Sequence, residues 1–153
     1  MPMPWTYRHG SREFRAFLDE AKDRMGLDSD NMAYTAVDGV FRTFRRRLTP
    51  QQGILFASAL PCVLAAIFTR DGDVTAPPVP FASREDMTHE AQALRPHHNL
   101  TPENAIEATA FALWRVMNSA ELVRVLEKLP PEACAFWPVD AVAVAGDLDR
   151  GII

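Results

Sequence analysis

The chain has 153 residues, of which 48% are hydrophobic and 24% charged, and its formal net charge is −4. This composition excludes a disordered chain, and the negative charge disfavours a dedicated nucleic-acid binder, which usually presents a basic face. The longest strongly apolar run, 59–68, is far shorter than the roughly 20 residues of a membrane-spanning helix, so we expect no membrane partner.

The amino-terminal segment and the cysteines indicate where the protein works. The first ten residues hold no apolar stretch that resembles a secretion signal. Cys62 and Cys134 lie just after Leu-Pro steps in apolar surroundings. Two such residues make neither a disulfide framework nor a metal cage and are typical of buried thiols in a reducing compartment. We therefore expect a cytoplasmic protein with buried, inert cysteines.

The first two predicted helices follow from the 3.6-residue period of apolar residues and from their end signals. Ser11 is a good N-cap and Gly26 a typical C-terminal residue, so the first helix should lie between them. A cap at 28–30 begins a second helix that extends to about Arg47. Gly39 within this helix costs roughly 1 kcal/mol relative to alanine. A close crossing by another helix would explain it.

Proline positions divide the next part of the chain. Thr49-Pro50-Gln51-Gln52 has the pattern of a capping box with proline at the first helical position, and it begins a third helix. Proline is not tolerated inside a helix, so the third helix should end at Leu60 and a short fourth helix should follow Pro61 to Phe68. The Pro-rich stretch 69–82 reads as a linker.

The second half of the chain has a similar order of signals. Ser83 begins a polar helix that extends to about Arg95. The pattern 101–104 caps a helix over 105–117 that is apolar nearly all round and therefore belongs in the centre of the molecule. A second capping box at 118–121 begins a seventh helix to Leu129, and a short eighth helix follows over 130–137.

The two halves align without gaps when 36–68 is placed on 105–137. This alignment pairs Leu60-Pro61 with Leu129-Pro130 and also matches the capped turns that precede them. A repeat of this size predicts two similar helical units that bury a face against each other.

We therefore expect an all-α fold with a single domain over 1–153, a bundle of about seven to eight helices. The expected parts are a first unit at 11–68, the linker at 69–82, a second unit at 83–137, and a tail at 138–153 whose conformation the pattern leaves open.

Several of these stretches resemble a bacterial family known as domain of unknown function 2267. The residues that carry the resemblance are Ala36-Val-Asp-Gly-Val-Phe, Arg46-Arg-Leu-Thr49, Ala59-Leu-Pro61, Glu103-Asn-Ala-Ile106 and Leu126-Glu-Lys-Leu-Pro130. The resemblance covers most of 14–137 and implies an all-helical, cytoplasmic bacterial protein without an assigned activity. It carries over no catalytic or binding residues. The chain departs from the family pattern at 76–80 and after Trp137, so a function there would be peculiar to this chain.

The densest potential metal ligands are His89, Glu90, His97 and His98. If Pro96 turns the chain back, these side chains could meet around zinc or a similar ion. The spacing matches no standard metal motif, and histidines in polar loops are usually solvated. A small metal-binding protein or enzyme is therefore an alternative hypothesis.

The only basic run consists of Arg42, Arg45, Arg46 and Arg47 at the end of the predicted second helix. These arginines could bind an anion or nucleic acid. The structural alternative is interaction with the helix C-terminal dipole and pairing with acidic residues of the first helix. No aromatic interleaving or groove-reading motif accompanies the run, so a nucleic-acid-associated regulator is a third hypothesis.

The cysteine at position 62 and the tryptophans are predicted to have structural roles or to contact another part of the protein or another subunit. Cys62 begins a helix but would need a nearby base to act as a nucleophile, and its neighbours look like core. Trp114 and Trp137 read as core, whereas Trp5 would anchor the amino terminus to the body or to another subunit. The sequence contains no phosphate loop, catalytic triad signature or cofactor motif. The leading hypothesis is a non-enzymatic protein-interaction module that self-associates.

Overall fold

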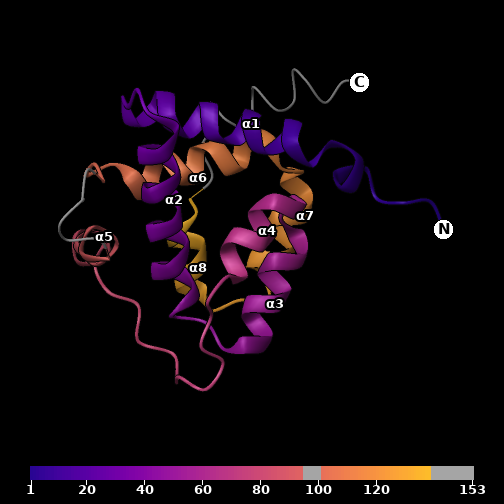
Figure 1. Cartoon of the computed structure of the whole chain (residues 1–153). Coiled ribbons are helices and arrows are strands. Elements are labelled where there is room, and N and C mark those ends of the chain that lie inside the picture. Colours follow the sequence, from indigo (N-terminus) through magenta and orange to yellow (C-terminus); the bar gives the residue numbers. More distant parts are fainter. Residues whose placement is uncertain (95–100, 139–153) are drawn as a thin grey trace.

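The computed structural model describes residues 1–94 and 101–138, and over these ranges the chain forms eight helices and no strand (Figure 1). The helices are α1 (Trp5–Met25), α2 (Asp30–Arg45), α3 (Pro50–Ala59), α4 (Cys62–Thr69), α5 (Arg84–Ala93), α6 (Ala105–Val116), α7 (Ser119–Leu126) and α8 (Pro131–Phe136). The expected all-α class is confirmed. The predicted tail, 138–153, lies almost wholly outside the described residues.

Short-range caps set the start of four helices, as the sequence predicts. The side chains of Ser29, Ser83 and Asn118 each accept a hydrogen bond from the backbone N–H three residues later. Thr49 and Gln52 form both bonds of a capping box, at 3.2 and 2.8 Å. These bonds satisfy backbone donors that have no partner inside the helix.

Each Leu-Pro step separates two helices. Leu60 ends α3 with an extended backbone, and Pro61 stands immediately before α4. Pro130 stands in the same way before α8, with Pro131 at its first position. Proline has no N–H to donate, so it fits the start of a helix and ends the preceding one.

The first helix is longer than predicted. It begins at Trp5 rather than Ser11, with a kink at His9, where φ is −123° and ψ is 21°. The extra turn is held by a tertiary contact, because the hydroxyl of Thr6 accepts a hydrogen bond from the backbone N–H of Cys62 at 2.9 Å. That bond caps α4, whose own N-cap is Pro61 and has no side chain to do so. A local sequence pattern cannot reveal it.

α6 begins at Ala105 as predicted, but its capping differs from the prediction. The N-cap is Asn104 without a side-chain cap, not Thr101. The side-chain amide of Asn104 donates instead to the carbonyl of Arg24 at the end of α1, at 3.0 Å. The carbonyl of Thr101 accepts a hydrogen bond from Gln92 at 3.0 Å. Bonds to α1 and α5 therefore position this segment in place of the local cap.

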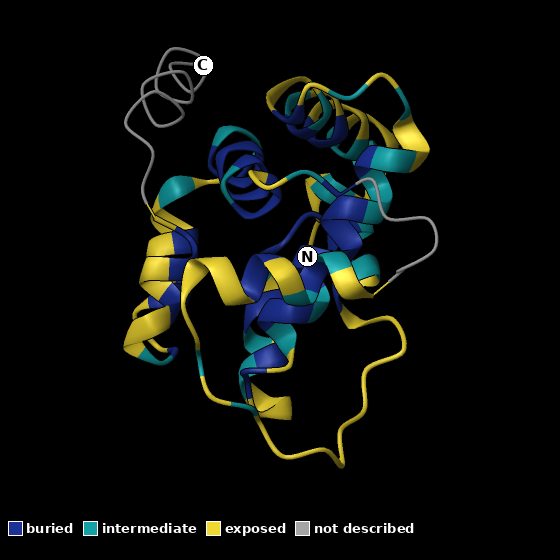
Figure 2. Ribbon diagram, turned by 90° about the vertical axis from the view of Figure 1, so that its left-hand side faces the viewer, coloured by how far each residue is buried: buried dark blue, intermediate teal, exposed yellow. Residues whose placement is uncertain are grey.

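The helices pack around α6 and a cluster of aromatic side chains. α1 lies along α6, and α5 packs on α2 (Figure 1). Nine of the twelve residues of α6 are buried, which confirms its central place. Phe44 of α2 meets Phe56, Phe136 and Trp137 at ring-centroid distances of 4.9, 4.8 and 5.2 Å. In Figure 2 the buried residues, in dark blue, lie mainly where helices face one another.

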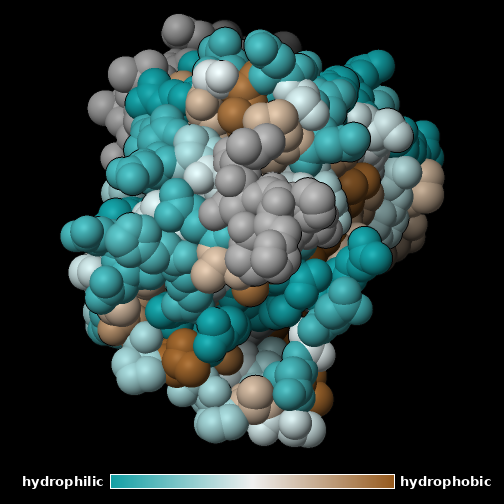
Figure 3. Space-filling model, turned by 60° about the vertical axis from the view of Figure 1, so that its left-hand side comes forward, coloured by the Kyte–Doolittle hydropathy of each residue, from teal (hydrophilic) through white to brown (hydrophobic). Residues whose placement is uncertain are grey.

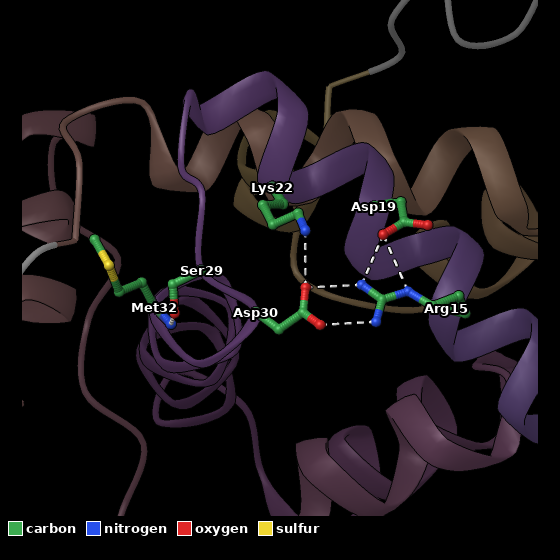
Figure 4. A network of polar contacts seen from close by, with 6 residues as sticks. All are labelled: Arg15, Asp19, Lys22, Ser29, Asp30 and Met32. Carbon is green, nitrogen blue, oxygen red and sulfur yellow. Dashed lines mark hydrogen bonds and ion pairs between the residues drawn. The ribbon is translucent and has the colours of Figure 1, made fainter.

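Polar contacts fix α1 against the start of α2. Arg15 donates hydrogen bonds to Asp30 at 2.9 Å and to Asp19, and Lys22 pairs with Asp30 at 2.9 Å (Figure 4). The hydrogen bonds from Arg15, and then from Lys22, hold the pKa of Asp30 well below its usual range. Asp30 is also the first residue of α2, where a negative charge interacts favourably with the helix dipole.

The bounds of the helices keep the spacing that suggested an internal repeat. α3 and α7 begin 69 residues apart, and so do α4 and α8. The duplication itself stays a prediction, as does the division into 11–68, 69–82 and 83–137.

Gly39 stands where α5 crosses α2, as its place in the sequence suggested. A Cβ at this position would lie 3.0 Å from the carbonyl oxygen of Ala91, closer than ordinary contacts allow.

Gly39→Ala should therefore lower the free energy of unfolding by about 1–3 kcal/mol, because the backbone of α2 or α5 must move to make room for the new methyl group. Urea denaturation checks this result. Gly53→Ala is the matched control: it lies in α3, its Cβ would meet no atom within 4 Å, and it should stabilise by about 0.5–1 kcal/mol. Equal effects of the two substitutions would contradict the close crossing.

Candidate functional site

Two arginines of the basic run, Arg42 and Arg45, bind groups at the end of α4 and in α2. Arg42 pairs with Asp38 at 3.1 Å and with Asp71 at 3.5 Å. Arg45 donates from Nη1 to the carbonyls of Phe68 and Arg70 at 2.7 and 2.8 Å. Cations at a helix C-terminus satisfy its free carbonyls and oppose its negative dipole end. Arg45 therefore caps α4 from outside.

The other two arginines, Arg46 and Arg47, bind Glu90 of α5. Arg46 approaches this carboxylate at 2.6 Å and Arg47 at 2.8 Å, and Arg47 also donates to the carbonyl of Thr43. Burial alone would raise the pKa of Glu90, but the hydrogen bonds and charges of the two arginines outweigh it and lower this pKa. The sequence suggested acidic partners on the first helix. They lie instead on α5, in the α4–α5 loop (residues 70–83) and within α2.

The structure describes only two of the four predicted metal ligands, His89 and Glu90. Glu90 is engaged by Arg46 and Arg47, and His89 lies beside it on α5. His97 and His98 lie outside the described residues. Within 1–94 and 101–138, no group of three His, Cys, Asp or Glu side chains could hold a metal ion. The four-residue metal site stays a prediction.

The cysteines differ from the expectation of two buried thiols. Cys62 is only half-buried, and its Sγ–H donates to the carbonyl of Thr6 at 3.3 Å. Cys134 is exposed. It lies on α8 between Ala133 and Phe136, which take the buried positions of this short helix. Because most of this segment is apolar, its sequence did not show which face of α8 is buried.

A cavity of about 420 Å³ lies between the ends of α2 and α4, the start of α3 and the α4–α5 loop. The residues that line it are Arg45, Arg46, Leu48, Thr49, Pro50, Gly53, Ile54, Phe68, Thr69, Asp71, Gly72, Asp73, Val74, Ala76, Pro77 and Val79. Of these residues, Leu48 and Phe68 are buried, whereas Ile54 and Val74 are exposed. A space of this size with mostly apolar walls is typical of small-molecule sites.

The loop that lines this cavity is held by bonds at its first residue and at Val79. Arg45 binds its first carbonyl at Arg70, and the N–H of Val79 donates to the carbonyl of Arg46 at 3.0 Å. Between them, Asp73 accepts hydrogen bonds from the N–H and hydroxyl of Thr75. In Figures 1 and 2 the loop runs along the outside of the molecule between α4 and α5. The loop therefore forms a fixed outer wall of the cavity.

Exposed apolar side chains gather at the amino terminus and beside the cavity. Met1, Met3, Trp5 and Tyr7 are exposed at the amino terminus, and Ile54 and Val74 at the cavity. On the face drawn in Figure 3, apolar residues form small separate patches among hydrophilic ones. Trp5 packs on His9 of its own helix, at 4.3 Å between ring centroids. Trp5 nevertheless remains exposed to solvent.

A family model described as an uncharacterized conserved protein, DUF2267, matches residues 14–136. The chain belongs to the DUF2267 family. No curated protein matches the chain. The cavity lies inside the part that matches DUF2267, whereas the exposed residues of the first turn of α1 lie before it.

Sequence reasoning missed this cavity in the DUF2267 chain. The available signal was Gly53, a glycine inside a helix whose start is otherwise well specified. The path of the α4–α5 loop carries no local signal, because Arg45 and Arg46 fix it through tertiary bonds. For the same reason, the partners of the basic run could not be read from its spacing.

Proposed function

We propose that this protein is a non-enzymatic interaction module that self-associates through the first turn of α1. The observation that carries the proposal is the exposure of Trp5 and Tyr7, at 57% and 64%. Large aromatic side chains that remain exposed within one helical turn are typical of protein-contact surfaces.

The surroundings of these aromatic residues suit a reciprocal contact. A hollow of about 400 Å³ lies against the same turn, lined by residues 7–12 and by Val63 of α4. In a two-fold dimer, the same patch meets itself, so each Trp5 can fill the hollow of the other copy. Arg8, His9 and Arg12 also line it, and the two copies would bring these basic groups together. Salt should therefore strengthen the association.

Size-exclusion chromatography with light scattering tests this proposal. The wild type should show a mass that rises with concentration towards two chains, more strongly at high salt. Trp5→Ser with Tyr7→Ser should remain a monomer, because the contact loses its aromatic anchors. Val123→Ser, an exposed residue of α7, is the matched control and should behave as wild type. A wild-type monomer at high concentration would contradict the proposal.

No observation favours the nucleic-acid hypothesis in the same way. Arg42, Arg45, Arg46 and Arg47 all have partners within the chain. Binding to nucleic acid stays a prediction that salt-dependent retention on heparin would support.

A further inference from the structure

The cavity beside α3 contains a glycine that helix packing does not require. Gly53 is buried in α3 and lines the cavity, yet an added Cβ would meet no atom within 4 Å. Inside a helix, glycine costs about 1 kcal/mol relative to alanine. At Gly39 a close backbone contact explains this cost, whereas at Gly53 there is only empty space. The absence of a side chain at Gly53 keeps the cavity open.

The cavity walls suit a molecule with an apolar body. Leu48 and Phe68 form buried apolar surface, and Ile54 and Val74 extend it to solvent. Removing apolar surface from water gives the free energy for such a ligand, at about 25 cal/mol per Å². Bonds to Arg70 and Val79 hold the α4–α5 loop in place, so the loss of conformational entropy on binding is small.

Two arginines, Arg45 and Arg46, and two aspartates, Asp71 and Asp73, line the cavity. Arg46 pairs with Glu90, Asp71 pairs with Arg42 and Arg70, and Asp73 accepts hydrogen bonds from Thr75. Among the described residues, no Asp or Glu oxygen forms an ion pair with Arg45, and Arg45 donates from Nη1 to the carbonyls of Phe68 and Arg70. Burial lowers the pKa of Arg45 and the charge of Arg42 lowers it further, and together they outweigh the opposite effect of the charges of Asp38 and Asp71. A guanidinium has five N–H donors, so Nε and Nη2 can still donate to a ligand. An anionic group there would offset the unfavourable burial of the cation.

We propose that this cavity binds a small monocarboxylate with an apolar chain, of the medium-chain fatty-acid class. The carboxylate lies at Arg45, because a guanidinium binds this group in a bidentate, charge-assisted geometry. The chain lies against Leu48 and Phe68 and passes over Gly53. This site is separate from the first turn of α1, so it goes beyond self-association.

Calorimetric titration with sodium octanoate tests the proposal on the full chain. The wild type should bind octanoate, and Gly53→Leu should bind it at least about tenfold more weakly because the new side chain fills the cavity. Octylamine has a similar chain with the opposite charge, and octan-1-ol a similar chain without charge. Both should bind at least about tenfold more weakly than octanoate, because Arg45 favours only the anion.

A second measurement does not depend on how the variant folds. In amide NMR spectra of the wild type, octanoate should shift signals of residues 45–54 and 68–79, around the cavity. Three results would overturn the proposal: no binding of octanoate, shifts confined to other parts of the chain, or octylamine binding as tightly as octanoate. Equal octanoate affinity for a folded Gly53→Leu variant, judged by circular dichroism, would also overturn it.

Discussion

Leu129→Ala is expected to lower the free energy of unfolding by about 2–5 kcal/mol, and Leu60→Ala should do the same. Both leucines are buried in the core cluster, each immediately before the proline that precedes a short helix. Alanine removes apolar contacts and leaves a cavity that the proline-fixed backbone cannot close. Urea denaturation of the variants, followed by circular dichroism, measures the loss.

The control for these substitutions is Val123→Ala. Val123 is exposed on α7, so its truncation should change the free energy of unfolding by less than about 0.5 kcal/mol. If Leu60→Ala and Leu129→Ala cost no more than the control, the Leu-Pro steps do not direct these leucines into the core.

Glu90→Gln is expected to lower the free energy of unfolding by about 2–4 kcal/mol at pH 7. The side chain of Arg47 is only 4% exposed and would lose the carboxylate that neutralises it. Removing one partner of a buried pair costs about 3–5 kcal/mol, and the 22% exposure of Glu90 reduces this figure. Arg46→Gln is the matched control, because Arg46 binds the same carboxylate from an exposed position and should cost less than about 1 kcal/mol.

The effect of Glu90→Gln should depend on pH. The pKa of Glu90 is lower in the folded protein than in the unfolded chain, where it is about 4.5. Its ionised form therefore contributes stability that is fully present above pH 4.5 and is lost as the pH falls through the folded-state pKa. The gap between wild type and Glu90→Gln should narrow on acidification from pH 7 to below this range. A gap that widens would contradict the pairing with Arg47.

How far the sequence predicts the fold depends on the range of the interaction. Thr49 and Gln52 bond within one turn, so the start of α3 follows from the sequence. The first turn of α1 depends on Cys62, more than fifty residues from Thr6, and no local pattern contains it. The nearly all-round apolar composition of α6 placed it in the core, but the apolar composition of α8 did not show that Cys134 faces solvent.

The candidate sites depend even more on tertiary contacts. The spacing of the basic run placed Arg45, Arg46 and Arg47 together at the end of α2. It could not show that Glu90 of α5 would meet two of these arginines, or that the carbonyls of α4 would bind Arg45. The cavity lies between segments that are distant in the sequence, and bonds from Arg45 and to the carbonyl of Arg46 join these segments. The only sign of the cavity that the sequence contains is a single residue, the glycine at position 53 inside a helix.

A dilution series of amide NMR spectra tests self-association through the first turn of α1 most directly, because it reports both whether copies meet and where. Signals of residues 5–12 and of Val63 should shift with concentration, and those of the cavity residues 48–54 should not. Spectra that stay unchanged over the whole range, or shifts confined to other helices, would contradict this account.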